Sequence, residues 1–248
     1  MGMLRKALCA FFLGLSAAFY AAPAAAADAR VVVELFTSQG CSSCPPADRL
    51  LAELAVEEGV LALSLPVDYW DYLGWKDTLA SPDNSDRQRQ YAVRRGDRAV
   101  YTPQMVINGG EHVTGNDAAA VRAAISRARP LPAKVKLAST DQAIEVTLDG
   151  QLPDGAAMAT VFLLQVKERE TVEIGRGENT GREITYVNVV RKVLPMGMWS
   201  GGTQTFRMPR HELKKSKGER CAVLVQLDDG SGPGAVVGAA SMTWEKSR

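Results

Sequence analysis

The sequence has few metal-binding side chains and no excess of either charge. It holds two histidines and four cysteines among 248 residues, and 29 basic residues face 28 acidic ones. A net charge of +1 without a long basic run argues against a nucleic-acid partner. A structural zinc site would need two ligands beyond a Cys-x-x-Cys pair. The remaining candidates, Cys221, His112 and His211, have no paired ligand spacing, so we expect no metal and no cofactor.

Long apolar runs are also missing, except at the N-terminus. Arg5 and Lys6 precede a mostly apolar stretch over 8–20, and three alanines precede Asp28. This pattern predicts a signal peptide over residues 1–27, since the stretch is too short for a spanning helix; an uncleaved anchor is the alternative. We therefore expect a periplasmic or secreted protein that meets the membrane only through its signal peptide during export. Cleavage removes Cys9 and leaves three cysteines in an oxidising compartment.

The most informative stretch is residues 31–46. A run rich in β-branched residues predicts a strand, a short turn carries Cys41 and Cys44, and a helical pattern begins near Pro46. Unpaired N–H groups and a partial positive charge at a helix start stabilise a thiolate, the attacking species in disulfide exchange. Two intervening residues let the second cysteine displace a mixed disulfide. A redox-active pair is favoured over a purely structural disulfide.

The rest of residues 28–131 predicts a mixed α/β domain. Asn108-Gly109 between apolar runs is a hairpin signal, and Asn116 is the expected cap of the last helix. The helix over 83–95 has few apolar positions and is expected to be largely solvated. The expected helices are 46–58, 83–95 and 117–129, with strands over 31–37, 60–67, from Thr102 to Asn108, and 112–114.

This order of elements resembles the thioredoxin-like superfamily over about residues 29–129. In that family a cis-proline opens the third strand beside the cysteines, and Pro103 after Thr102 matches its position. The resemblance implies a cis Thr102–Pro103 bond whose strand edge binds an incoming cysteine-containing peptide. It also implies a buried carboxylate as proton acceptor, for which Glu34 is the nearest candidate. A solvated glutamate at a strand edge is the alternative for Glu34.

Residues 132–248 predict an all-β, β-sandwich-like domain of short strands. The loop over 175–182 is read as a flexible hairpin loop in preference to an anion-binding nest or a lid. Met196 and Met198 suit Cu(I), but without a methionine array they are read as gap-filling residues. Cys221 shares the apolar face of a strand with Val223 and Val225, which predicts a buried free thiol.

Four motifs, at residues 34–48, 67–71, 101–105 and 174–179, are similar to those of one secreted bacterial family, domain of unknown function 1223. That resemblance covers nearly the whole chain after the signal peptide and implies a thioredoxin-like domain and an exported protein. It implies no substrate.

Two functions fit these observations. The first is an exported thiol–disulfide oxidoreductase-like protein, in which Cys41 attacks, Cys44 resolves, and Thr102 and Pro103 bind substrate. Its partner would be a cysteine-containing exported protein or a small thiol, with a separate redox partner. The alternative is a non-catalytic thioredoxin-fold binding protein with a structural disulfide or a Cu(I) site at the cysteines. A strongly depressed thiol pKa at Cys41 would favour the enzyme; a buried, alkylation-resistant pair would favour the structural role.

Overall fold

A computed structural model describes residues 27–213, 219–228, 230 and 232–243. Residues 1–26 of the predicted signal peptide lie outside the described part, which begins at Ala27, the last residue of that segment. The helices are α1 (Pro45–Leu54), α2 (Pro82–Arg95) and α3 (Ala118–Arg127), with short 3-10 turns η1 (Asp71–Leu73) and η2 (Arg210–Glu212). The strands are β1 (Ala27–Asp28), β2 (Val31–Thr37), β3 (Val60–Pro66), β4 (Gln104–Ile107), β5 (His112–Thr114), β6 (Lys134–Ser139), β7 (Ala143–Asp149), β8 (Ala159–Glu173), β9 (Glu183–Trp199), β10 (Gln204–Pro209), β11 (Glu219–Asp228) and β12 (Pro233–Thr243).

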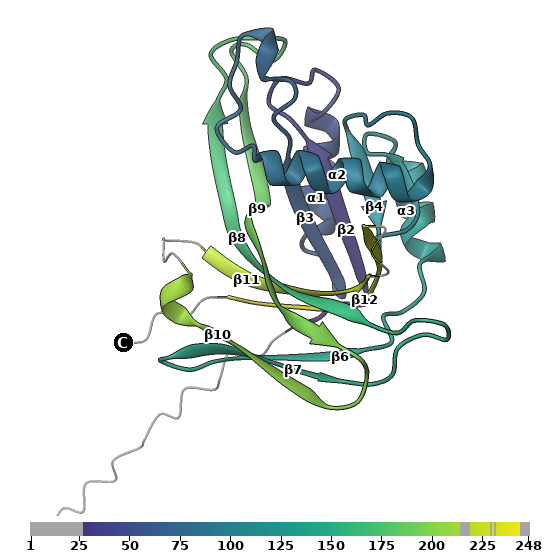
Figure 1. The fold of residues 1–248 in the computed structure, drawn as a ribbon. Coiled ribbons are helices and arrows are strands. Elements are labelled where there is room, and N and C mark those ends of the chain that lie inside the picture. The colour runs from purple at the N-terminus through teal and green to yellow at the C-terminus, as the bar shows by residue number, and fades with distance from the viewer. Residues whose placement is uncertain (1–26, 214–218, 229, 231, 244–248) are drawn as a thin grey trace, which may run out of the picture.

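Most strands belong to one large sheet. In the described part of the chain it has nine strands in the order β1-β12-β11-β8-β9-β3-β2-β4-β5. The pairs β2–β3 and β3–β9 are parallel, and β9 joins β3 through Val189 opposite Ser64. The sheet therefore continues across the boundary predicted at residue 132 (Figure 1), because the edge of β3 accepts a strand from the second half. The structure confirms a mixed α/β class, and it places most strands in one large sheet with few helices.

Helices cover the first half of this sheet on both faces. Every residue of β2 is buried, as expected for a strand that is packed on both sides. Val33 and Leu35 pack with α1 and α3, whereas Val32 and Phe36 pack on the other face with Tyr91 of α2. Figure 1 shows α1 and α2 on opposite sides of β2 and β3. Residues that alternate along β2 thus point to different helices.

The buried face of α2 is polar, which corrects the expectation of a largely solvated helix. Asn84, Ser85 and Gln88 are buried together with Tyr91. The Gln88 amide donates to the Tyr101 carbonyl at 2.8 Å and to Gln104 Oε1 at 3.0 Å. Hydrophobic periodicity records only apolar residues, so it missed a face that is buried because its amides are hydrogen-bonded.

The sequence predicted the hairpin turn at Asn108-Gly109 correctly, but not the N-cap of α3. Asn108 and Gly109 both have positive φ, 46° and 69°, as a type I′ hairpin requires. The cap of α3 is Asp117, whose carboxylate accepts the Ala120 N–H, rather than the predicted Asn116. The Asn116 amide instead donates to the Ser43 carbonyl at 3.4 Å, in the turn between Cys41 and Cys44.

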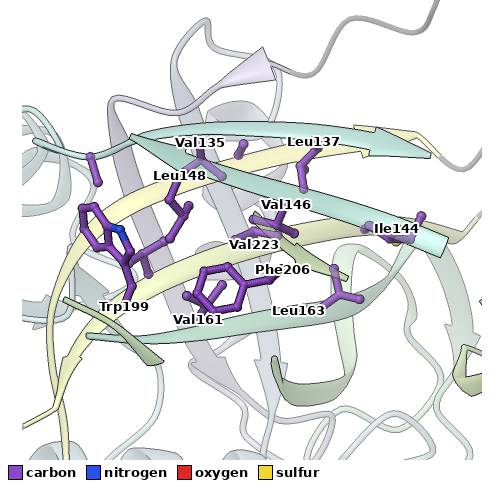
Figure 2. Close-up of a cluster of buried hydrophobic side chains, with 14 of the residues drawn as sticks. Val135, Leu137, Ile144, Val146, Leu148, Val161, Leu163, Trp199, Phe206 and Val223 are labelled. Carbon is purple, nitrogen blue, oxygen red and sulfur yellow. The ribbon is translucent and has the colours of Figure 1, made fainter. Parts of the chain in front are cut away.

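The second half packs a small sheet against the large one. In the described residues, β10, β7 and β6 form this second sheet. Its side chains meet those of β8, β11 and β12 in one apolar cluster, in which Ile144 and Val146 face Leu163 and Val223 (Figure 2). The arrangement is sandwich-like, but one of its two layers is part of the nine-stranded sheet. Cys221 lies in this cluster as a buried free thiol, as predicted.

No helix in the described residues is both long and apolar enough to cross a membrane.

Candidate functional site

Cys41 and Cys44 lie in the turn between the end of β2 and the start of α1, the cysteine turn, and they form a disulfide. Cys41 and Cys44 are bonded, with their Cα atoms 5.4 Å apart. The Cys44 N–H donates to the Cys41 carbonyl at 3.2 Å, which closes the turn, and Cys44 is the N-cap of α1. Pro45 and Pro46 occupy the first helical turn, where their missing N–H groups cost nothing. The local sequence thus places the disulfide at a helix N-terminus, as expected.

Both cysteines are buried in this oxidised state. Their residue exposures are 1% for Cys41 and 0% for Cys44, while Ser42 and Ser43 between them are exposed. The Cys41 sulfur lies 3.4 Å from the Ser43 hydroxyl oxygen. The exposed part of the turn is therefore Ser42 and Ser43, and not the cysteines.

Asp48 is the carboxylate closest to the pair along α1. Its N–H donates to the Cys44 carbonyl at 3.1 Å, so the side chains at 44 and 48 lie on one face of the helix. Asp48 is buried, and its Oδ1 accepts the Thr37 hydroxyl at 2.8 Å. Burial raises the pKa of Asp48 to about 7, the Thr37 hydrogen bond lowers it, and Asp77 raises it further. Oδ2 is buried and has no hydrogen-bond partner in the described residues.

Two further polar groups, Asp77 and Tyr186, lie close enough to Asp48 to interact with its charge. The Asp77 carboxylate accepts the N–H groups of Gln39, Leu79 and Ala80, the first at 2.8 Å. Burial raises the pKa of Asp77 despite these bonds. Burial, then the negative charges of Asp48 and Asp77, raise the pKa of the Tyr186 phenol. Tyr186 comes from β9, so the second half of the chain contributes to the surroundings of Asp48.

Glu34 lies on the face of β2 that packs against α2, whereas the cysteines lie at the start of α1, which packs on the other face. Glu34 is fully buried, which excludes the alternative of a solvated glutamate at a strand edge. Its two oxygens accept hydrogen bonds from Arg87 Nε and the Tyr91 hydroxyl, each at 2.6 Å. Because Glu34 lies on the face of β2 opposite α1 and both of its carboxylate oxygens are hydrogen-bonded, these contacts favour a structural ion pair with Arg87. Asp48 is therefore a second candidate for the proton acceptor, beside Glu34.

The predicted substrate-binding residues lie near the start of α1. The Thr102–Pro103 bond is cis, as predicted. A Cβ placed on Gly115 would lie 3.2 Å from Pro103 Cβ and 3.3 Å from Ala47 Cβ, so Pro103 is adjacent to the first turn of α1. The Thr102 hydroxyl accepts the Trp70 indole N–H at 2.8 Å, and Trp70 itself packs against Gly40. The structure brings Thr102 and Pro103 together with the cysteine turn.

The β8–β9 loop contacts the cysteine turn directly, which the sequence interpretation as a flexible hairpin loop missed. Asn179 is fully buried, and its amide donates to the carbonyls of Gln39 and Cys41, each at 2.9 Å. The Ser42 N–H donates to the Glu178 carboxylate at 3.1 Å. Figure 1 shows the β8–β9 end of the large sheet beside the loops that follow β2 and β3. The site is therefore built from both halves of the chain.

No cluster of three or more metal-ligating side chains exists among the described residues. Cys221 lies in the apolar cluster of the second half, to which neither Cys41 nor Cys44 belongs, and burial raises its pKa to about 12. It is therefore a core thiol and not part of the site.

A family model described as "Protein of unknown function (DUF1223)" matches residues 32–226. The chain belongs to this family. A crystal structure of a protein from Agrobacterium tumefaciens is 35% identical, with a TM-score of 0.76 over 89% of this chain and 96% of that one. HBP35 of Porphyromonas gingivalis shares the fold at 14% identity, with a TM-score of 0.61 over 90% of this chain and 77% of that one.

A probable thioredoxin from Archaeoglobus fulgidus is 37% identical over 78 residues of this family member. The match covers 32% of this chain and 66% of that thioredoxin, slightly less than two thirds of its length. The sequence signal for the contact of the β8–β9 loop with the cysteine turn was the resemblance of residues 174–179, which end at Asn179, to a motif of the family. For Asp48, the sequence signal was its spacing of four residues from Cys44, which places the two side chains on one face of a helix.

Proposed function

We propose that this family member is an exported thiol–disulfide oxidoreductase-like protein that acts through Cys41 and Cys44. The observation that carries the proposal is the buried carboxyl of Asp48, one helical turn after Cys44, with its pKa raised to about 7. A group with this pKa can give or take a proton at neutral pH. A purely structural disulfide gains nothing from a buried titratable neighbour, whose burial costs free energy.

The proposed exchange begins at Cys41. A substrate thiolate attacks the Cys41 sulfur, the Cys41–Cys44 bond breaks, and Cys44 leaves as a thiolate that takes the proton from Asp48. The second substrate thiolate then attacks the substrate sulfur of the mixed disulfide and displaces Cys41 as a thiolate. Two substrate thiols are oxidised, and the protein disulfide is reduced by two electrons. In the reverse direction Asp48 accepts the Cys44 proton.

Thr102 and Pro103 are proposed as the substrate-binding segment. The proximity of Pro103 to the first turn of α1, and the hydrogen bond between Thr102 and Trp70 beside Gly40, support this role. The substrate would be a cysteine-containing exported protein or a small thiol. The match to a probable thioredoxin supports the chemistry, and the N-terminal sequence pattern supports a periplasmic or secreted location.

One observation favours the competing role of a non-catalytic binding protein with a structural disulfide. Cys41 and Cys44 are both buried when oxidised, so the disulfide is shielded from reductants. A reduced pair of thiolates would also suit Cu(I).

Alkylation distinguishes the two roles. The reduced protein is treated with iodoacetamide across a pH series, and modification of Cys41 is followed by mass spectrometry. The oxidoreductase proposal predicts a thiol pKa well below the ordinary value of about 8.5. It also predicts that the reduced protein cleaves a peptide disulfide and that Asp48→Asn alters the pH dependence of this cleavage near pH 7. A pair that resists alkylation and leaves the peptide disulfide intact would establish the structural role.

A further inference from the structure

The β8–β9 loop fixes the cysteine turn through the side chain of Asn179. The amide spans Gly40, because it donates to the carbonyls on either side of that residue, those of Gln39 and Cys41. The bonds join residues 140 and 138 positions apart in the chain. Both lie in a fully buried environment, where water cannot replace a lost donor.

The Cys41 carbonyl oxygen has two donors. It accepts the Cys44 N–H, which closes the turn across the cysteine pair, and it accepts the Asn179 amide at 2.9 Å. The amide therefore orients the same carbonyl that brings the two cysteine backbones together. A carbonyl oxygen has two lone pairs, so both bonds are compatible.

The burial of Asn179 also costs free energy of folding, which suggests that the residue is not there for stability alone. Its Oδ1 atom is buried and has no hydrogen-bond partner in the described residues. A buried polar atom without a partner is unfavourable, and such atoms are concentrated where a residue has another role. The amide end of Asn179 is used fully, whereas its carbonyl end is not.

We infer that Asn179 is a positioning residue that holds Cys41 and Cys44 in the geometry in which their thiols close to a disulfide. The inference rests on the proposed function, since exchange requires the pair to close repeatedly. In the oxidised protein the disulfide itself restrains the turn. In the reduced protein that restraint is absent, and the Asn179 hydrogen bonds keep the two thiols together.

Removal of the amide should therefore favour the reduced state. The reduced turn gains conformational freedom, while the oxidised turn stays restrained by its covalent bond. We expect Asn179→Ala to shift the equilibrium with glutathione by about tenfold toward the dithiol, which corresponds to about 30 mV in potential. Oxidised glutathione is the oxidant in this equilibrium: each protein disulfide formed releases two molecules of reduced glutathione.

The test equilibrates the wild-type protein and three variants with defined ratios of reduced and oxidised glutathione. The fraction of dithiol at Cys41 and Cys44 is measured by alkylation after unfolding and mass spectrometry. Asn179→Ala removes the amide, and Asn179→Asp keeps its size but places carboxylate oxygens near the two carbonyls. Arg176→Ala, an exposed position on the same loop, is the matched control. Thermal unfolding of each oxidised variant establishes that it is folded.

The inference predicts that both Asn179 variants shift toward the dithiol and that Arg176→Ala does not. If either folded Asn179 variant keeps the wild-type equilibrium within twofold, the inference is wrong. The equilibrium needs no protein substrate, so it remains informative even if the wild-type protein fails to cleave a peptide disulfide and the proposed function fails.

Discussion

Replacement of Asp48 by asparagine should change how the stability of the oxidised protein depends on pH. Burial raises the pKa of Asp48 to about 7 in the folded protein, and an exposed aspartate has a pKa of about 4. Between these values the folded protein binds a proton that the unfolded chain has released. The protonated Asp48 carboxyl therefore contributes to the free energy of unfolding at low pH, and this contribution is lost as the pH rises through about 7.

The size of the effect follows from the shift. Each pH unit in this window changes the free energy of unfolding by about 1.4 kcal/mol, so about 3 kcal/mol is lost between pH 5 and pH 7. Asparagine does not titrate, and its side-chain oxygen can still accept the Thr37 hydroxyl. Asp48→Asn should thus resemble the wild type only below about pH 4, and its stability advantage over the wild type should grow as the pH rises from 5 to about 7.

Urea unfolding of both oxidised proteins at pH 5, 6, 7 and 8 measures this difference, because other titrating groups cancel between them. Asp141→Asn, at an exposed turn between β6 and β7, is the matched control and should follow the wild type at every pH. If the difference in free energy of unfolding between Asp48→Asn and the wild type stays constant within about 0.5 kcal/mol from pH 5 to pH 8, the assignment of a raised pKa to Asp48 is refuted.

Three further predictions concern the cysteines and the buried ion pair. Limiting iodoacetamide should modify reduced Cys41 before Cys44, as read by peptide mass spectrometry; the opposite order would exchange their roles. Cys221→Ser should leave exchange activity intact and cost about 1–3 kcal/mol in urea unfolding, and a covalent dimer band lost in this variant would show that the thiol is exposed. Arg87→Met should cost about 3–5 kcal/mol because it leaves the Glu34 charge buried without its partner. Adding Glu34→Leu should recover much of that loss, and a single variant as stable as the wild type would mean that the ion pair is not buried.

Local sequence signals predicted the cysteine turn well. Prolines in the first turn of α1 locate the helix start, and Asn108-Gly109 locates a hairpin. Each of these features depends on backbone preferences within a few residues. The alternation of Cys221 and Val223 likewise placed Cys221 on a buried face of β11, although Ala222 and Leu224 bury the other face as well.

Contacts between distant segments were not predictable in the same way. The pairing of Ser64 with Val189 depends on which sheet edge is open, and no local pattern records that. Asn179 in a glycine-rich loop has the composition of an ordinary turn, yet it is buried against Cys41. Asp48 was overlooked because an acidic residue in the first turn of a helix is common at the surface.

Mixed-disulfide trapping tests the central claim, that Cys41 and Cys44 perform exchange, most directly. The reduced Cys44→Ser variant is mixed with a peptide disulfide, and Cys41→Ser serves as the matched control. The proposal predicts that Cys44→Ser accumulates a mixed disulfide at Cys41, because the resolving thiol is absent, and that Cys41→Ser forms little. Wild-type protein should pass through the same species without accumulating it. If Cys44→Ser remains folded and forms no mixed disulfide at Cys41, the pair is structural and the proposed function is contradicted.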